Sequence, residues 1–128
     1  MKTELSLLVA VVALAFVQIM VAAFLAAPQF GLSALLGNRD DLPVLTGAAD
    51  RAQRAYRNML ETLVLFAALV LVAHVTGKTN ATTALGAQLF FWGRLAYAPI
   101  YIIGIPVIRT LAWFVAIIGL VLIFLQLI

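Results

Sequence analysis

Apolar residues occur along this chain in runs that are long enough to cross a membrane, with polar residues gathered at their ends. A helix that crosses the hydrocarbon core of a bilayer needs about 20 mainly apolar residues. The first run, from Leu5 to Ala27, carries no charge at all, and three more runs with few charges follow it. The pattern predicts four membrane-spanning helices, at about residues 5–27, 48–76, 81–103 and 106–126.

Short polar segments predict where these helices end. Gly77 to Asn80 is a tight polar turn, because glycine and asparagine favour turns. Gly104 and Pro106 mark a second break, and proline suits the first turn of a new helix because its missing N–H would be unpaired there. The longest non-helical stretch runs from Gln29 to Gly47. We find no repeat and no second domain, so the prediction is one all-α, four-helix membrane bundle over residues 1–128.

The first apolar run could instead belong to a cleavable signal peptide. The apolar core of such a peptide is about 7–15 residues long. The uncharged run from Leu5 to Ala27 is clearly longer than that. We therefore expect this segment to remain in the protein as its first membrane helix.

The composition agrees with a membrane protein and excludes several kinds of site. The chain is 66% hydrophobic and 10% charged, whereas soluble domains are about 45–50% apolar and about 25% charged. Eight Lys and Arg stand against five Asp and Glu, which is too few for a solvated basic stripe, so nucleic acid is not an expected partner. With no cysteine and one histidine, we expect neither a disulfide framework nor a metal site.

The basic residues near the ends of the predicted spans are divided unequally between the two sides. The first and third loops share one side, which holds Arg39, Arg51, Arg54, Arg57 and Arg109, and the opposite side holds Lys2 and Lys78. Loops on the cytoplasmic side of a membrane carry an excess of Lys and Arg. We therefore expect a multi-pass protein with loops one and three in the cytoplasm and both termini on the opposite side.

Polar residues within the predicted spans fall into two stripes. A charge at the centre of a membrane helix costs about 2.5–3.5 kcal/mol on insertion scales, so its placement is informative. The stripe on the second helix consists of Arg54, Arg57, Asn58 and Glu61, and that on the third of Arg94, Tyr97 and Tyr101. Helical spacing puts each set on one face. If the two helices are antiparallel neighbours, Glu61 and Arg94 lie at comparable depth and could pair.

Each stripe has a plainer interpretation. Arginines near the end of a span often extend to lipid headgroups, although that gives no reason for Asn58 and Glu61 to continue the stripe inward. The close arginines of the second helix also repel one another, so we expect an anion beside them. Glu61 could serve only as a structural ion-pair partner of Arg57 or Arg94. The two tyrosines of the third helix could be packing residues.

Some other residues are assigned to packing. Trp92 and Trp113 are interpreted as packing or interface aromatics. Small residues let membrane helices approach closely, but Gly86, Gly93, Gly104 and Gly119 are too irregularly placed to predict a strong motif of this kind.

Three motifs resemble a known family. They are Arg54-Ala-Tyr-Arg57-Asn58-Met-Leu-Glu61, Arg94-x-x-Tyr97-x-x-x-Tyr101 and Arg109-Thr110. In a four-helix membrane protein of this length they resemble the MAPEG family, the membrane-associated proteins in eicosanoid and glutathione metabolism. The similarity covers nearly the whole chain. The stretches from Asn38 to Pro43 and from Ala67 to His74 look like the bacterial branch of the family, which implies a bacterial inner membrane.

The resemblance implies an assembly and a ligand. The family is built as homotrimers of four-helix protomers, with glutathione held between adjacent subunits toward the cytoplasmic side. That placement agrees with the orientation counted from the basic residues. The expected partners are therefore the lipid bilayer, glutathione as co-substrate, a lipophilic second substrate and two further copies of the chain.

The resemblance also implies roles for individual residues. Arg54, Arg57, Asn58 and Glu61 match the family motif that binds the charged ends of glutathione. Arg94 and Tyr101 match further contact positions, Tyr97 stands where some members have histidine, and Thr110 replaces a hydroxyl residue. Arg109 resembles the arginine that holds the sulfur as a thiolate, and it is the expected catalytic residue.

Two departures from the family pattern narrow the expected activity. The end of the first helix, Ala26-Ala-Pro-Gln-Phe30, lacks a basic residue that some eicosanoid synthases carry. The spacing from Tyr101 to Arg109 is one residue shorter than in the prostaglandin-forming branch. We therefore expect a glutathione transferase or peroxidase-like activity on a lipophilic electrophile. The alternative is a non-catalytic structural or accessory membrane subunit that keeps the fold.

Overall fold

The computed structural model describes residues 2–31, 36–37 and 42–128, and in that part of the chain every long element is a helix. The helices are α1 (Thr3–Phe30), α3 (Gly47–Val75), α4 (Ala81–Ile103) and α5 (Pro106–Leu127). The predicted all-α, four-helix architecture is confirmed. Most of the predicted stretch from Asn38 to Pro43, with Arg39, lies outside the described residues.

Helix α1 is longer than the first apolar run suggested, because it continues through Pro28. Proline removes one backbone hydrogen bond from a helix interior. The helix nevertheless closes beyond it, where the N–H of Gly31 donates to the carbonyl oxygen of Ala27 over 2.9 Å. Gly31 has φ +83°, a conformation that glycine adopts at little cost and that ends the helix.

Three of the described helices, α1, α3 and α5, are long and apolar enough to cross a membrane. Helix α4 has 23 residues but is not among them, because polar side chains such as Gln88 and Arg94 interrupt its apolar sequence. The protein is therefore an integral membrane protein by its apolar helices, and the crossing of α4 stays a prediction.

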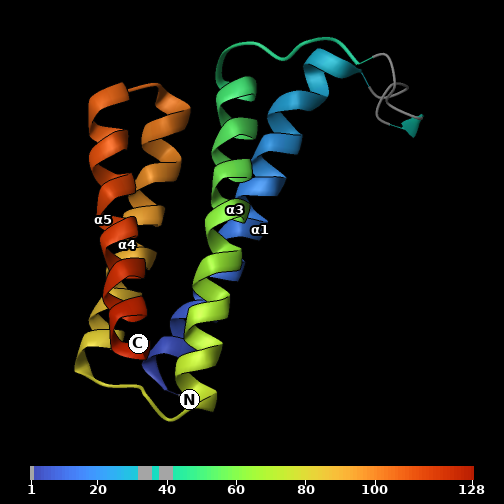
Figure 1. The fold of residues 1–128 in the computed structure, drawn as a ribbon. Coiled ribbons are helices and arrows are strands. Elements are labelled where there is room, and N and C mark those ends of the chain that lie inside the picture. The colour runs from blue at the N-terminus through green and yellow to red at the C-terminus, as the bar shows by residue number, and fades with distance from the viewer. Residues whose placement is uncertain (1, 32–35, 38–41) are drawn as a thin grey trace.

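The helices form two antiparallel pairs, α1 with α3 and α4 with α5, and the pairs lie beside each other (Figure 1). One end of the bundle carries both termini and the turn at residues 76–80, and we call it the terminal end. The other carries the end of α1, the start of α3 and the α4–α5 turn at residues 104–105, and we call it the loop end (Figure 1). This arrangement places the helix ends that border the first loop at the same end of the bundle as the third loop, as the sequence predicts.

Aromatic stacking joins the two pairs at the centre of the core. The rings of Phe66 on α3 and Phe90 on α4 are stacked, with centroids 4.2 Å apart, and both side chains are buried. Val11 and Ala15 of α1 belong to the same cluster. Burying an aromatic side chain of this size stabilises a fold by about 1.5–3 kcal/mol in water, whereas in a bilayer the gain comes from close packing.

Helices α4 and α5 pack closely because small residues face each other along their contact. A Cβ atom on Gly86 would lie 2.6 Å from the carbonyl oxygen of Gly119, and one on Gly93 would lie 2.8 Å from the backbone nitrogen of Ala116. The prediction that these glycines are too irregular for a packing motif was wrong. Their spacing of seven residues on α4 is matched on α5 by alanine as well as glycine, which a search for glycine alone misses.

Side-chain contacts fix both connections at the loop end. Gln29, near the end of α1, accepts from the N–H of Thr46 and donates to its carbonyl oxygen, both over 3.0 Å. The Nε of Arg51 on α3 donates to the carbonyl oxygen of Ile102 over 2.8 Å. Because the last carbonyl groups of a helix have no partner within it, Arg51 ties the end of α4 to α3.

Candidate functional site

The two predicted polar stripes meet at Arg94 and Asn58, near the loop end. The Nη1 of Arg94 on α4 donates to the Oδ1 of Asn58 on α3 over 2.7 Å. Arg94 is only 1% exposed, so this is a short, charge-assisted hydrogen bond in a poorly hydrated place. It explains why an arginine is tolerated in the interior of α4.

Arg94 has unused hydrogen-bonding capacity. Its guanidinium carbon lies 4.2 Å from the centre of the Tyr97 ring, which attracts a cation through the negative face of the ring. Its Nε and Nη2 atoms have no hydrogen-bond partner among the described residues. A buried guanidinium with one acceptor and two nitrogen atoms that lack a partner is only partly compensated.

A second tyrosine, Tyr101, lies between two further arginines. The guanidinium carbon of Arg109 is 4.4 Å from the centre of the Tyr101 ring, and that of Arg54 is 5.8 Å from it. The rings of Tyr97 and Tyr101 lie 5.4 Å apart. Helices α3, α4 and α5 therefore each contribute to one cluster of cations and aromatic rings.

An open cavity of about 260 Å³ lies beside this cluster. Its lining comes from three helices and consists of Asn58, Tyr97, Tyr101, Arg109, Thr110 and Trp113. The hydroxyl of Thr110 donates to the carbonyl oxygen of Pro106 over 3.1 Å. Its oxygen can therefore act toward a ligand as a hydrogen-bond acceptor. Five of the residues singled out from the sequence thus share one cavity.

Arg57 and Glu61 are placed differently from the rest of the predicted set. Both are exposed on the surface of α3. Within the described residues the one ion pair joins Arg54 to Asp50 over 2.8 Å. The suggested pairing of Glu61 with Arg94 or with Arg57 is therefore wrong for the single chain: Asn58, one helical turn before Glu61, takes the acceptor position beside Arg94. The anion expected among the arginines of α3 is in part Asp50.

Trp113 is the cavity residue that sequence reasoning missed, since it was assigned to packing. It lies on α5 at four residues beyond Arg109 and three beyond Thr110. Residues at these spacings share a helix face. The spacing could have placed Trp113 beside a predicted catalytic arginine, but an aromatic residue near a membrane boundary has a more ordinary explanation.

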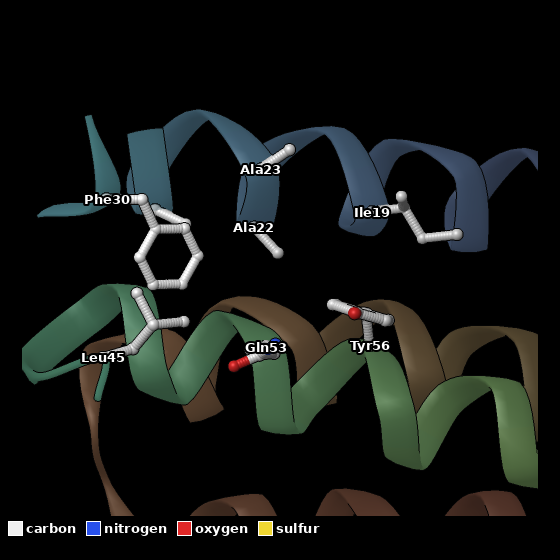
Figure 2. A pocket seen from close by; sticks show the side chains of 8 residues that line it. Ile19, Ala22, Ala23, Phe30, Leu45, Gln53 and Tyr56 are labelled. Carbon is white, nitrogen blue, oxygen red and sulfur yellow. The ribbon is translucent and has the colours of Figure 1, made fainter. Parts of the chain in front are cut away.

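A second cavity of about 260 Å³ lies between α1 and α3, also toward the loop end (Figure 2). Most of its lining is apolar, and Phe30 and Leu45 close one end of it (Figure 2). Gln53 and Tyr56 of α3 bring the polar atoms. An apolar cavity with a few polar groups suits a lipophilic molecule.

The electrostatics of the loop-end cluster favour an anionic ligand. Arg54, Arg94 and Arg109 surround the two tyrosines, and Asp50 neutralises only the first of them. Guanidinium groups bind carboxylates in forked pairs. Among the described residues no three His, Asp or Glu side chains gather as metal ligands would, so the chemistry on offer is that of cations, hydroxyls and an amide.

Comparison with known proteins identifies the family of the chain. The model of the MAPEG family matches residues 6–128, essentially the whole chain. No curated protein matches the chain, and neither does a solved structure. The four-helix membrane fold and the match over nearly every residue lead to one conclusion. The chain belongs to the MAPEG family.

Proposed function

We propose that the protein binds glutathione and has glutathione transferase or peroxidase-like activity on a lipophilic electrophile at the membrane; for the transferase, the step joins glutathione to that electrophile. The observation that carries the proposal is Tyr101 packed between Arg54 and Arg109 at the edge of a cavity. Glutathione offers two carboxylates, an ammonium and amide groups, and this cluster offers the cations that carboxylates need. Membership of the MAPEG family supports the same ligand.

Arg109 is the residue to which we assign the catalytic role. A free thiol has a pKa near 8.5, and a cation within hydrogen-bond reach favours its thiolate. The thiol gives its proton to solvent. The electron pair of the thiolate then forms a C–S bond with the electrophilic carbon, while the bond from that carbon to its leaving group breaks and the leaving group keeps the pair. Arg109 and Thr110 line the cavity from α5, and Asn58 lines it from α3.

The remaining glutathione contacts are assigned to a shared site between subunits. Pockets that hold drug-sized ligands are about 300–1,000 Å³, and one chain offers about 260 Å³. Glu61 is exposed on an apolar helix, where an unpaired charge facing lipid is costly. A neighbouring copy of the chain would cover it, and Glu61 and Arg57 would then bind the charged ends of the tripeptide. The homotrimer, rather than a dimer, rests on the family resemblance.

One observation favours the non-catalytic alternative, a structural or accessory subunit that retains the fold. Arg94 and Asn58 are hydrogen-bonded to each other and Arg94 is buried. In that interpretation they lock α3 to α4 and take no part in ligand binding.

A conjugation assay separates the two functions. The purified protein in detergent is given glutathione and a panel of lipophilic electrophiles, and loss of the free thiol is followed with time. If the protein is an enzyme, the conjugation rate should saturate as the glutathione concentration rises, and catalysis should be lost in Arg109→Ala. Rates equal to those of the uncatalysed mixture for every electrophile, with glutathione bound, would favour the accessory subunit.

A further inference from the structure

A third cavity, of about 350 Å³, is lined by residues of the terminal end, whereas the arginine cluster lies toward the loop end. Figure 1 shows these two ends of the bundle. Lys2, Thr3 and Glu4 line it from the start of α1, and Thr79 and Asn80 line it from the turn before α4. Helix α1 is apolar enough to cross a membrane. Its first turn therefore lies near the level of the lipid headgroups.

Glu4 is the unusual residue of this cavity. It is only 5% exposed, yet within the described residues its carboxylate takes part in no hydrogen bond or ion pair. A carboxylate in the first turn of a helix is favoured by the helix dipole, but that does not satisfy its oxygen atoms. The Glu4 carboxylate lines the cavity, where a cation can reach it and pair with it.

Lys2 supplies the opposite charge at the same cavity. Its Nζ donates to the Oγ1 of Thr79 over 2.7 Å, and an ammonium has two further donors. Lys2 precedes α1 and its side chain does not cap the helix, so the first backbone N–H groups of α1 have no capping partner. Lys2 and these N–H groups favour an anion, which would lie next to the Glu4 carboxylate.

Asn80, which lines the cavity from the turn before α4, already uses its side chain in hydrogen bonds within the fold. Asn80 caps α4 by accepting from the N–H of Thr83 over 2.9 Å, and its Nδ2 donates to Gln126 over 2.8 Å. The groups that remain for a ligand are the ammonium of Lys2, the start of α1 and the carboxylate of Glu4. A ligand that fits them carries an anion and a hydrogen-bonding cation close together.

We infer that this cavity binds the headgroup of a zwitterionic phospholipid with a primary ammonium, of the phosphatidylethanolamine type. Its phosphate lies at Lys2 and the start of α1, and its ammonium donates to Glu4. An anionic headgroup without an ammonium would leave Glu4 unpaired and repelled. The inference does not depend on glutathione, because the loop-end cluster shares no residue with this cavity.

The first test uses the unaltered protein, so that no variant has to fold. The protein is placed in lipid nanodiscs, and lipids that remain after transfer to mild detergent are counted by native mass spectrometry. Four headgroups are compared: ethanolamine, its N-methyl and N,N-dimethyl forms, and choline. Since the N-methyl and N,N-dimethyl forms still carry an N–H donor and choline carries none, we expect retention to fall about fivefold to tenfold from ethanolamine to choline, with the main step at choline. Equal retention of all four would overturn the inference.

Variants and a soluble competitor sharpen the result. Glu4→Gln should abolish the preference for ethanolamine over choline, and Lys2→Gln should lower the retention of both. Lys78→Gln is the matched control: this lysine lies at the same end but contacts the carbonyl oxygen of Leu127 over 3.4 Å, outside the cavity. An equal loss in the control would reduce the effect to surface charge and overturn the inference. Inorganic phosphate that binds alone and displaces the lipid would overturn it in favour of a soluble anion.

Discussion

The guanidinium of Arg109 lies over the ring of Tyr101, 4.4 Å from its centre, and so the arginine of α5 contacts α4 at the cavity that both residues line. The contact fixes where the cation stands relative to Tyr97 and Asn58, which line the same cavity from α4 and α3. A cation held by an aromatic face keeps its N–H groups available at its edge. Those edge groups are the ones that a ligand's anion can reach.

Arg109→Ala should reduce the conjugation rate by at least tenfold while leaving much of the glutathione affinity intact. The reason is that the variant loses the cation beside the sulfur and keeps the other arginines. The ultraviolet absorbance of the bound thiolate, measured against pH, should shift to higher pH. Arg109→Lys should restore only part of the rate, since lysine cannot form a forked contact. An unchanged absorbance titration with glutathione still bound would remove Arg109 from the mechanism.

Asn58→Leu should destabilise the protein by about 2–3 kcal/mol, because it leaves the buried guanidinium of Arg94 without its acceptor. Thermal unfolding of the purified protein in detergent measures the effect. Asn58→Asp keeps an acceptor and serves as the comparison, and it should unfold at a temperature close to that of the unaltered protein. Equal stability of the leucine and aspartate variants would mean that the bond contributes nothing to the fold.

Gly93→Val should separate α4 from α5, since a Cβ atom at Gly93 already approaches the backbone of Ala116. Overpacking of this kind costs about 1–3 kcal/mol. The matched control is Ala96→Val, an exposed position on the same helix, which should lower stability by less than about 0.5 kcal/mol. Similar unfolding temperatures for both variants would contradict the tight contact of these two helices.

The membrane orientation can be tested with single cysteines, because the chain has none of its own. A cysteine at Asn38 should react only when reagents reach the cytoplasm, and one at Lys78 should react from the opposite side. This follows from the five basic residues of loops one and three against two at the other end. Labelling of Asn38 from outside intact cells would reverse the orientation and the proposed glutathione entry.

The helices could be predicted closely from the sequence because the apolar runs are separated by strong breaks. The turn at Gly77 to Asn80 and the pair Gly104 and Pro106 each leave one place for a helix to end. The end of α1 was harder to predict, because a proline such as Pro28 usually marks the end of a helix. Near the end of a helix, however, a proline removes only one backbone hydrogen bond, and α1 continues through it.

The side-chain partners were less predictable than the helix faces. Helical spacing put Arg54, Asn58 and Arg94 on facing stripes, and the structure brings them to one cluster. Helical spacing alone could not decide whether Asn58 or Glu61 is the partner of Arg94. The two residues lie three positions apart on α3, and which of them lies level with Arg94 depends on how far α3 is shifted along its axis relative to α4. That offset is set by packing at Phe66 and Phe90, which a one-dimensional pattern does not contain.

The proposed glutathione site between subunits can be tested at Glu61. If a neighbouring subunit covers it and glutathione's ammonium binds it, Glu61→Gln should weaken glutathione binding by more than tenfold, about 1.4 kcal/mol, without dissociating the trimer. Native mass spectrometry in detergent gives the oligomeric state of both proteins. Stable monomers that bind glutathione fully would contradict the shared site.

Calorimetric titration of the purified, detergent-solubilised protein with glutathione is the decisive test of glutathione binding. We expect saturable binding by the unaltered protein, and a loss of that binding when Arg54 and Arg109, the two arginines that contact the Tyr101 ring, are both changed to alanine. Absence of any saturable heat with the folded, unaltered protein at millimolar glutathione would contradict it.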